Sequence, residues 1–314
     1  MIKRGHFRIG SNKWNPTIYK GGTEYKAVNV HGYYAELDSF FDVRFSFTAA
    51  ELQAMSPGDK IYYDESHNRL TTTAGTNTLI GTIFWDYNTH TYDEIPCRRV
   101  AGCEILNVNF PDTGKCQQSG SSYMTVKIAQ SGSYGAQNKV CSTSSVSDGY
   151  HNCCAWYDLL ETLQDKSWKT SNTISNSTDL YPAMMLAYRY HTAGTFPGYW
   201  YIPASANLRQ RTGERDANSE YYFLWQLACS ITSGNDNCLS YGRFEGSYGF
   251  YDHQSSYEYS ATGAAMFSAG NTWGCAYSVT TLKTNSFARW PVMQLWPKER
   301  MAEKKQTLTY YHLN

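Results

Sequence analysis

The sequence predicts an α+β protein built from many short strands and a few helices. Runs rich in aromatic and β-branched residues, bounded by Gly, Asn and Ser, are typical of strands. Only a few segments show apolar residues at helical spacing, and these segments follow a residue of the kind that caps helix N-termini. The 314 residues are enough for two domains and a sizeable core. No fixed-period repeat divides the chain.

The first part of the chain is predicted to be β-rich around one short helix. Residues 1–50 are interpreted as a small attachment or oligomerisation segment, or equally as the first strands of one continuous domain. Residues 40–47 alternate in part, as a half-buried strand does. A helix is predicted at 48–55, with Thr48 as N-cap and Glu51 at the capping-box position. Strands at 60–63 and 79–85 flank a polar connection and suggest a hairpin.

The middle and end of the chain predict the remaining helices and strands. Loops at 119–122 and 131–137 flank a strand at 124–129. A helix is predicted to begin at 147–149, because apolar side chains recur at helical spacing up to Leu163. A second helix is predicted at 180–191, with Asp179 as N-cap and Pro182 in its first turn. A third helix is predicted at 221–229. Strands are predicted after it, at 257–261, 272–280 and 287–295. The last residues, 297–314, are predicted to form a polar tail.

Residues 241–296 hold the composition of a recognition surface. Aromatic residues occur there at irregular spacing among Ser, Gly and Asn, whereas a core segment would bury them at a steady period. Tyr supplies contact area at low entropy cost, and small polar residues supply adaptable hydrogen bonds. We interpret the stretch as a displayed binding surface. The alternative is a Tyr-rich sheet with no partner.

The charge balance argues against two classes of partner. Lys plus Arg number 27 and Asp plus Glu number 27, a formal net charge of +0. Non-specific binding to nucleic acid needs a basic stripe, and attraction to an anionic membrane needs basic clusters.

The N-terminal residues lack the apolar core of a secretory signal, and no run of about 18 apolar residues occurs. We therefore expect no nucleic acid partner, no signal peptide and no membrane insertion.

The nine Cys residues do not show the regular, even spacing of a secreted disulfide framework. Most are predicted to be reduced, buried side chains. Cys229 and Cys238 flank a short polar loop and could pair in an oxidising compartment. His151-Asn-Cys-Cys brings three potential zinc ligands together but lacks a second CxxC pair. We therefore expect no metal.

Several short motifs together resemble a known fold family. They are Trp200-Tyr-Ile-Pro-Ala, Asn207-Leu208, Tyr259-Ser-Ala-Thr, Trp273 and Ala288-Arg-Trp-Pro-Val. Their order is similar to that of the C-type-lectin-like (formylglycine-generating-enzyme-like) fold, nearest to the variable proteins of diversity-generating retroelements and their bacterial and phage relatives. A hairpin at 58–64 and 80–84 resembles one that precedes such domains. The sequence departs from the pattern at Glu258-Tyr259, where the family has Tyr-Trp, and at Ala204, where it has Ser.

The resemblance implies a domain at 56–296 that displays a variable region at about 241–289. In such proteins, mutagenesis directed at adenines rewrites selected codons. Phage members lie at tail-fibre tips, often as trimers, and bind host receptors. The implied partners are a host surface protein or glycan, further copies of the chain and phage tail components. The implied location is the virion, after synthesis in the host cytoplasm, and the alternative is a bacterial cell surface. The candidate ligand-binding residues are Tyr241, Arg243, Phe244, Glu245, Tyr248, Phe250, Tyr251, His253, Tyr257, Asn271 and Tyr277.

An enzyme on the same scaffold is the remaining alternative. The chain resembles the formylglycine-generating enzyme, an oxidase, only at the scaffold, because Cys275 stands without the family's second active-site cysteine. The calcium-binding triplets of lectins are missing, and residues 234–237 are interpreted as a turn. Asp93-Glu94 and Asp252-His253 are interpreted as solvated loop residues. We therefore expect a binding protein with no catalytic residue and no cofactor.

Overall fold

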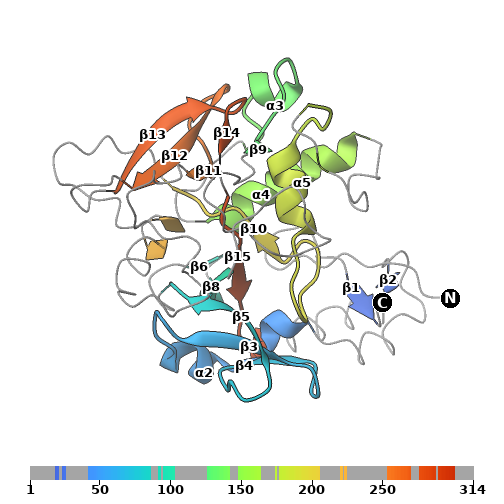
Figure 1. Cartoon of the computed structure of the whole chain (residues 1–314), viewed down its shortest axis with the longest axis vertical. Coiled ribbons are helices and arrows are strands. Elements are labelled where there is room, and N and C mark those ends of the chain that lie inside the picture. Colours follow the sequence, from blue (N-terminus) through green and yellow to red (C-terminus); the bar gives the residue numbers. More distant parts are fainter. Residues whose placement is uncertain are drawn as a thin grey trace, which may run out of the picture. The chain divides into compact units, whose positions relative to one another are not determined.

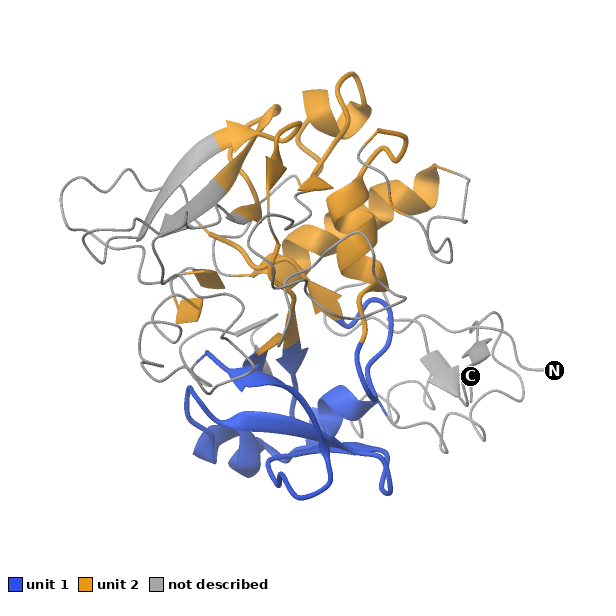
Figure 2. Cartoon of the chain, in the orientation of Figure 1, with its two compact units in different colours: residues 1–100, 192–199, 294–314 blue, residues 101–191, 200–293 orange. Residues whose placement is uncertain are grey.

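The computed structural model describes residues 18–20, 23–25, 42–85, 91–92, 95–102, 126–141, 148–163, 174, 177–205, 220–221, 223–224, 253–269, 276–287 and 289–300. Two compact units divide the chain (Figure 2). Unit 1 comprises residues 1–100, 192–199 and 294–314, and unit 2 comprises 101–191 and 200–293. Each unit therefore draws on stretches that are distant in sequence. The predicted division into 1–50, 56–296 and 297–314 stays a prediction.

The described elements form a mixed α+β structure with a curled antiparallel sheet and few helices (Figure 1). This confirms the predicted class. In unit 1, strand β3 (Lys60–Asp64) pairs antiparallel with both β4 (Arg69–Thr71) and β5 (Thr78–Ile83). The predicted hairpin between 60–63 and 79–85 is thus confirmed, with β4 as an additional strand in the connection. The other elements within this unit are β1 (Ile18–Lys20), β2 (Thr23–Tyr25), η1 (Val43–Phe45), α2 (Ala49–Ala54), β6 (Thr91–Tyr92) and β7 (Ile95–Pro96).

Helix α2 begins where its capping residues predict. The hydroxyl oxygen of Thr48 accepts a hydrogen bond from the Glu51 N–H at 3.1 Å, and the Glu51 carboxylate accepts one from the Thr48 N–H at 2.7 Å. The hydrogen bonds that the Glu51 carboxylate accepts from the Thr48 N–H and hydroxyl lower its pKa. At the other end, Arg98 donates to the carbonyls of Leu52 at 2.8 Å and Gln53 at 3.2 Å, and also to that of Met55. Both ends of this short helix therefore have partners for their free backbone groups.

The predicted strand at 40–47 is wrong for residues 43–45, which form the 3-10 helix η1. The Asp42 carboxylate accepts from the Arg44 N–H at 3.0 Å and from its guanidinium at 2.6 Å. A side chain that binds the backbone two residues on closes a turn. The Arg44 guanidinium also lies 3.8 Å from the ring centroid of Tyr199 and 5.0 Å from that of Trp296. The alternating apolar residues of this segment therefore belong to a turn, and not to a strand.

Unit 2 places two longer helices beside a set of short antiparallel strands. Strand β11 (His253–Glu258) pairs with β12 (Gly263–Ala269), which pairs with β13 (Ala276–Leu282). Strand β10 (Trp200–Tyr201) pairs with β15 (Val292–Leu295), and β9 (Val126–Lys127) pairs with β14 (Ser286–Phe287). The helices are α3 (Tyr134–Gln137), α4 (Gly149–Thr162) and α5 (Pro182–Arg189). Strand β8 (Arg98–Gly102) and strand β15 each contribute residues to both units.

Helix α4 starts as predicted, because the Asp148 carboxylate accepts from the His151 N–H at 3.0 Å. The prediction of Asp179 as the cap of α5 is wrong: the cap position is Tyr181, and Pro182 begins the helix with its φ already set. The predicted loop at 131–137 contains helix α3. The predicted strand at 287–295 is divided into β14 and β15 around Pro291, whose nitrogen carries no hydrogen to donate. Residues 220–221 and 223–224 are helical, and the rest of the predicted helix at 221–229 lies outside the described residues.

Aromatic side chains fill the core between α4, α5 and β10. Trp156 on α4 meets Tyr181 edge-on at a centroid distance of 5.3 Å, and Tyr157 meets Tyr188 at 5.1 Å. Trp200 on β10 meets Tyr190 at 5.1 Å. Edge-to-face pairs of this kind add stability beyond the area that they bury. The aromatic strand of the Trp200-Tyr-Ile-Pro-Ala motif is therefore a core element and not part of a surface.

Candidate ligand-binding surface

The predicted binding residues fall only in part within the described residues. His253 and Tyr257 lie on β11, and Tyr277 lies on β13. Tyr257 is half-buried, and it is the only one of the eleven whose side chain the structure describes. Outside the described residues lie Tyr241, Arg243, Phe244, Glu245, Tyr248, Phe250, Tyr251 and Asn271.

Strand β11 is buried along most of its described length. Gln254 pairs with Met266 and Glu258 with Ala264, so that β11 bulges between them. Gln254, Ser255, Ser256 and Glu258 are all fully buried. Tyr257 is half-buried, and among the side chains of β11 that the structure describes it is therefore the one that reaches solvent.

The described part of the sheet carries two large exposed side chains that the predicted set does not include. Tyr259, directly after β11, is 55% exposed, and Leu282, at the end of β13, is 52% exposed. Leu282 pairs with Gly263, which adds no side chain beside it. Exposure of single apolar residues is common. Here, however, Tyr259 lies two residues after the half-buried Tyr257. Leu282 pairs with the neighbour of Ala264, the partner of Glu258, and so it belongs to the face away from Glu258. The irregular run of tyrosines pointed to Tyr259, whereas no sequence signal pointed to Leu282.

A buried ion pair fixes the other side of this sheet. The Glu258 carboxylate lies 2.5 Å from the Lys283 ammonium, and neither side chain is exposed. The same carboxylate accepts from the N–H groups of Val140 at 3.1 Å and Cys141 at 2.5 Å. Lys283 also donates to the carbonyls of Gly135 and Asn138, each at 2.8 Å. Burial lowers the pKa of Lys283, and the charge of Glu258 opposes this. The pair therefore holds residues 135–141 against the ends of β11 and β13.

A second buried contact anchors the start of β11. The Arg289 guanidinium donates to the Gln254 side-chain oxygen at 2.8 Å and to the Val126 carbonyl at 2.9 Å. The Gln254 amide in turn donates to the Leu282 carbonyl at 3.0 Å. Burial lowers the pKa of Arg289 to about 10, which leaves the guanidinium charged at neutral pH. The arginine in the closing motif Ala288-Arg-Trp-Pro-Val thus acts in the scaffold.

A third buried group ties the Trp200-Tyr-Ile-Pro-Ala motif to helix α4. The Glu220 carboxylate accepts from the Gly149 N–H at 2.8 Å, the Ala204 N–H at 2.6 Å and the Tyr201 hydroxyl at 2.8 Å. Ala204, which follows the proline of the motif at the position where the family has Ser, therefore contributes its backbone N–H to Glu220. Next to this motif, the Ser256 N–H on β11 donates to the Pro203 carbonyl at 3.1 Å. The sheet is thus connected to the core by hydrogen bonds of four residues of β11, which are Gln254, Ser255, Ser256 and Glu258.

The potential metal ligands of the described residues do not form a cluster. No group of three His, Cys, Asp or Glu side chains gathers there in a way that could hold a metal ion. Within the His151-Asn-Cys-Cys run, the Cys153 thiol contacts the Ile202 carbonyl at 3.7 Å, and burial raises its pKa well above the ordinary value. Cys97, Cys141, Cys153 and Cys154 are buried thiols, as predicted for reduced cysteines.

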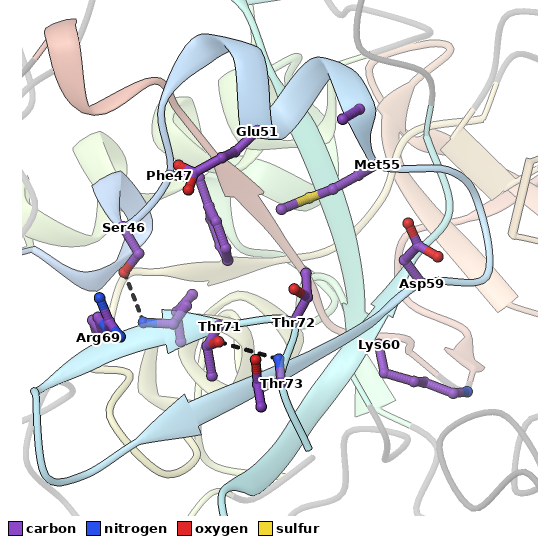
Figure 3. A pocket seen from close by; sticks show the side chains of 12 residues that line it. Ser46, Phe47, Glu51, Met55, Asp59, Lys60, Arg69, Thr71, Thr72 and Thr73 are labelled. Atoms are coloured by element: carbon purple, nitrogen blue, oxygen red, sulfur yellow. Dashed lines mark hydrogen bonds between the residues drawn. The ribbon is translucent and has the colours of Figure 1, made fainter. Parts of the chain in front are cut away.

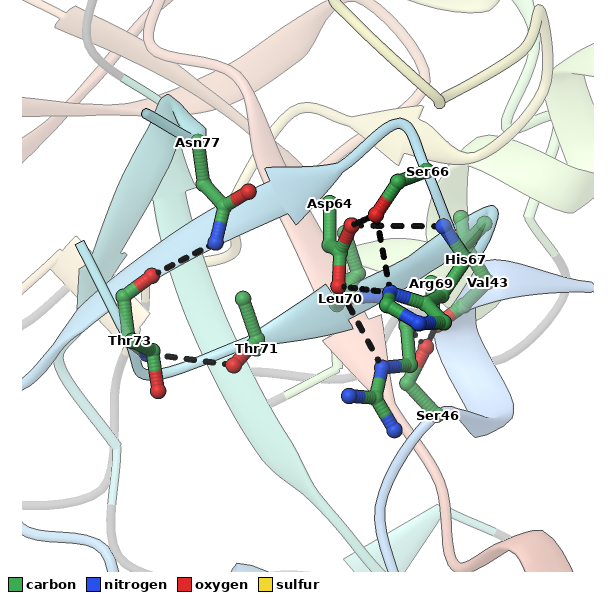
Figure 4. A network of polar contacts seen from close by, with 10 residues as sticks. All are labelled: Val43, Ser46, Asp64, Ser66, His67, Arg69, Leu70, Thr71, Thr73 and Asn77. Atoms are coloured by element: carbon green, nitrogen blue, oxygen red, sulfur yellow. Dashed lines mark hydrogen bonds and ion pairs between the residues drawn. The ribbon is translucent and has the colours of Figure 1, made fainter. Parts of the chain in front are cut away.

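One Ser, His and Asp group occurs in unit 1, at the turn between β3 and β4 (Figure 4). The Asp64 carboxylate accepts from the Ser66 hydroxyl at 2.6 Å and contacts the His67 ring nitrogen Nδ1 at 2.7 Å. A nucleophilic triad needs histidine between serine and aspartate. Here one histidine nitrogen, Nδ1 of His67, contacts both the Asp64 carboxylate and the Ser66 hydroxyl, at 2.7 and 2.9 Å, and Ser66 also bonds Asp64 directly. The arrangement is that of a turn network, and the Ser66 bond lowers the pKa of Asp64 to about 2.

Comparison with known proteins finds no matching family model, curated protein or solved structure. Among the helices in the described ranges, none is both long and apolar enough to cross a bilayer.

Proposed function

We propose that this chain is a ligand-binding protein of the C-type-lectin-like class. Its ligand would meet the outer face of β11 together with the Tyr-rich stretch that precedes it. The setting that fits the resemblance best is the tip of a phage tail fibre, where the ligand is a host surface protein or glycan. A bacterial surface adhesin is the alternative setting for the same surface.

The observation that carries the proposal is the change from buried to exposed side chains at the end of β11. Gln254 and Glu258 are completely buried, and each is bound by a charged side chain from outside the strand, Arg289 and Lys283 respectively. The positions before and after Glu258 hold tyrosines, one half-buried and the other exposed. A contact surface gains affinity when its aromatic groups are held rigidly, because less entropy is lost on binding. The buried contacts supply that rigidity.

The binding mechanism follows from the residue types. Tyrosine rings supply contact area, and Arg243, Glu245 and His253 supply polar specificity. We expect a single copy of such a shallow surface to bind its ligand weakly. Several copies on one particle would bind by avidity, which raises affinity by about two to four orders of magnitude when the geometry allows simultaneous contact.

The direct test is replacement of Tyr248, Tyr251 and Tyr257 together by Ala, followed by measurement of adhesion to host cells. We expect adhesion to be lost while the circular dichroism spectrum and thermal midpoint remain close to those of the wild type. Tyr134→Ala is the matched control, because Tyr134 is 58% exposed on helix α3. Undiminished adhesion of the folded triple variant would sink the proposal.

The retroelement origin has a separate test at the DNA level. Sequencing of the locus and of many copies of the gene from one lineage should reveal a near-repeat of the variable region beside a reverse transcriptase gene, with differences confined to template adenines. Phage structural genes nearby would favour the tail fibre, and an export system would favour the adhesin. Absence of any repeat or variation would leave a binding domain with a fixed surface.

A further inference from the structure

Unit 1 contains a groove between helix α2 and strand β4, with a volume of about 620 Å³ (Figure 3). That volume lies in the range of sites that bind small molecules. Residues between 46 and 55 form one side of the groove and residues 69–73 form the other, with Asp59 and Lys60 at one end. The groove therefore shares no residue with the surface proposed above for β11.

The apolar residues of the groove offer little surface to a ligand. Phe47 and Met55 point into the groove from the helix side (Figure 3). They are only 5% and 6% exposed, however, and Leu70 is 2% exposed. Apolar contact stabilises a complex in proportion to the area that it removes from water, and here that area is small. Affinity at this site must therefore come mainly from polar contacts.

The charged side chains of the groove balance one another. The lining contains two carboxylates, those of Glu51 and Asp59, and two cationic groups, those of Lys60 and Arg69. Hydrogen bonds from Thr48 lower the pKa of Glu51, and the charge of Arg69 adds to this effect. A ligand with a net charge of either sign would meet an opposing charge as well as a favourable one. The groove therefore favours a ligand without net charge.

Both carboxylates keep one oxygen that can accept a hydrogen bond from a ligand. Oε2 of Glu51 accepts from the Thr48 N–H at 2.7 Å and from the Thr48 hydroxyl at 2.8 Å. Oδ2 of Asp59 accepts from the Ser56 N–H at 2.8 Å. Within the described residues, the second oxygen of each carboxylate has no hydrogen-bond partner. A carboxylate oxygen accepts strong, charge-assisted hydrogen bonds from hydroxyl donors.

Donors and hydroxyl groups face the carboxylates from the strand side of the groove. Arg69 is 54% exposed, and its Nε lies 3.6 Å from the Asp64 carboxylate. A guanidinium carries five N–H donors, so that most of them remain for a ligand. The Thr71 hydroxyl oxygen accepts from the Thr73 N–H at 3.1 Å and can still donate its own hydrogen. Thr72 and Thr73 are exposed, and their hydroxyls can both donate and accept.

We propose that this groove binds an uncharged saccharide. Each hydroxyl of a sugar can donate one hydrogen bond and accept others. Such a ligand matches a lining with open acceptors, open donors, hydroxyl groups and no net charge. Hydroxyls of the sugar donate to Glu51 and Asp59, while others accept from Arg69 and exchange hydrogen bonds with the threonines at 71–73. The site goes beyond the function proposed for β11 and does not depend on it.

The first test applies the full chain to an array of neutral oligosaccharides and of the same oligosaccharides capped with sialic acid. We expect neutral glycans to bind and the sialylated forms to bind no better. Titration of the best free saccharide, followed by NMR, then gives its dissociation constant. This constant should change less than about twofold between about 20 mM and about 500 mM NaCl, because salt screens interactions between ions and the ligand carries no charge.

Two pairs of variants separate groove binding from general effects on folding. Ala54→Trp places a large side chain in the groove and should abolish binding, whereas Ala50→Trp, exposed on the same helix outside the lining, should not. Glu51→Gln keeps a side chain that can form the capping box, but it replaces one acceptor oxygen. Binding should weaken about tenfold, the effect of losing roughly one hydrogen bond. Glu65→Gln, at an exposed position outside the lining, should leave binding unchanged.

Three results would overturn the proposal. The first is that no neutral saccharide binds. The second is that sialylated glycans, or free amino acids titrated in the same way as a zwitterionic alternative, bind more tightly. The third is that Ala54→Trp and Glu51→Gln bind the best saccharide as well as the wild type does. The triple replacement of Tyr248, Tyr251 and Tyr257 by Ala distinguishes the two sites, because a glycan of the groove still binds to it. A glycan that the triple variant loses and Ala54→Trp retains belongs to the surface of β11 and counts against the groove.

Discussion

Glu258 and Lys283 form an ion pair of 2.5 Å, in which neither side chain reaches solvent. The two residues come from the ends of different strands, and their remaining hydrogen bonds go to the backbone of residues 135–141. A buried ion pair with its further bonds satisfied is a poor source of net stability, but it is costly to break. Its effect here is to fix where β11 and β13 end.

Removal of one partner should therefore be severe. Lys283→Met leaves the Glu258 carboxylate buried without its counter-charge, and we expect a loss of about 3–5 kcal/mol in the free energy of unfolding. Denaturant titration monitored by circular dichroism measures this. Lys298→Met is the control, because Lys298 is exposed, and it should change stability by less than about 0.5 kcal/mol. Equal effects of the two substitutions would contradict a structural role for the pair.

Gly149→Ala should destabilise the protein although it improves helix propensity. A Cβ at this first residue of α4 would lie 2.7 Å from a Glu220 carboxylate oxygen and 2.9 Å from the Ala204 nitrogen, and it would also collide with the Ile202 carbonyl. Overpacking of this kind costs about 1–3 kcal/mol, whereas propensity alone predicts a gain of up to about 1 kcal/mol. A lower thermal midpoint of Gly149→Ala would show that the overpacking dominates, and a higher midpoint would show that the helix propensity dominates.

Thr48→Ala should weaken the start of α2. The substitution removes the side-chain oxygen that accepts from the Glu51 N–H, and loss of an N-cap typically costs about 1 kcal/mol. Thr72→Ala, at an exposed threonine of the same unit, serves as the control and should be close to neutral. A denaturant midpoint for Thr48→Ala that equals that of Thr72→Ala would show that the capping box contributes nothing.

The hydrogen bonds that Asp64 forms with Ser66 and His67 should make the stability of the protein depend on pH in the acidic range. Its pKa is lowered from 3.8 to about 2, first because of the Ser66 hydrogen bond and then because of His67. A carboxylate with a lowered pKa in the folded state stabilises it above pH 4, and this contribution is lost as the pH falls from about 4 to about 2. Thermal midpoints of wild type and Asp64→Asn should therefore differ at pH 5–7 and converge toward pH 2. A difference that stays constant over this range would contradict the assignment.

Local signals predicted the helices better than the strands. Helix α2 and the start of α4 depend on a capping side chain within three residues, which the sequence displays directly. The turn at 43–45 escaped prediction because Phe, Val and Phe alternate there as in a strand, while the decisive Asp42–Arg44 contact overrides the pattern. Asp179 looked like a cap, but Pro182 sets the first turn later.

The scaffold of the candidate surface could not be predicted from its sequence. Glu258 pairs with Lys283, and Arg289 binds Gln254, at separations that no local pattern encodes. Glu258 appeared as a departure from the family motif, although its buried carboxylate is an anchor. The predicted set took Tyr257 from the irregular tyrosines of residues 241–259 and left out Tyr259, which is the more exposed of the two.

The buried contacts of β11 also limit which part of the gene can vary. Every codon for Gln, Glu and Lys contains an adenine, so mutagenesis of template adenines would replace Gln254, Glu258 and Lys283 along with their neighbours. A lineage that varied these codons would lose the ion pair and the Arg289 contact in most of its copies. If adenine-directed variation acts on this gene, its boundary must therefore lie before codon 254. The repertoire would then come from codons 241–253 alone, and Tyr257, Tyr259 and Leu282 would be the same in every copy.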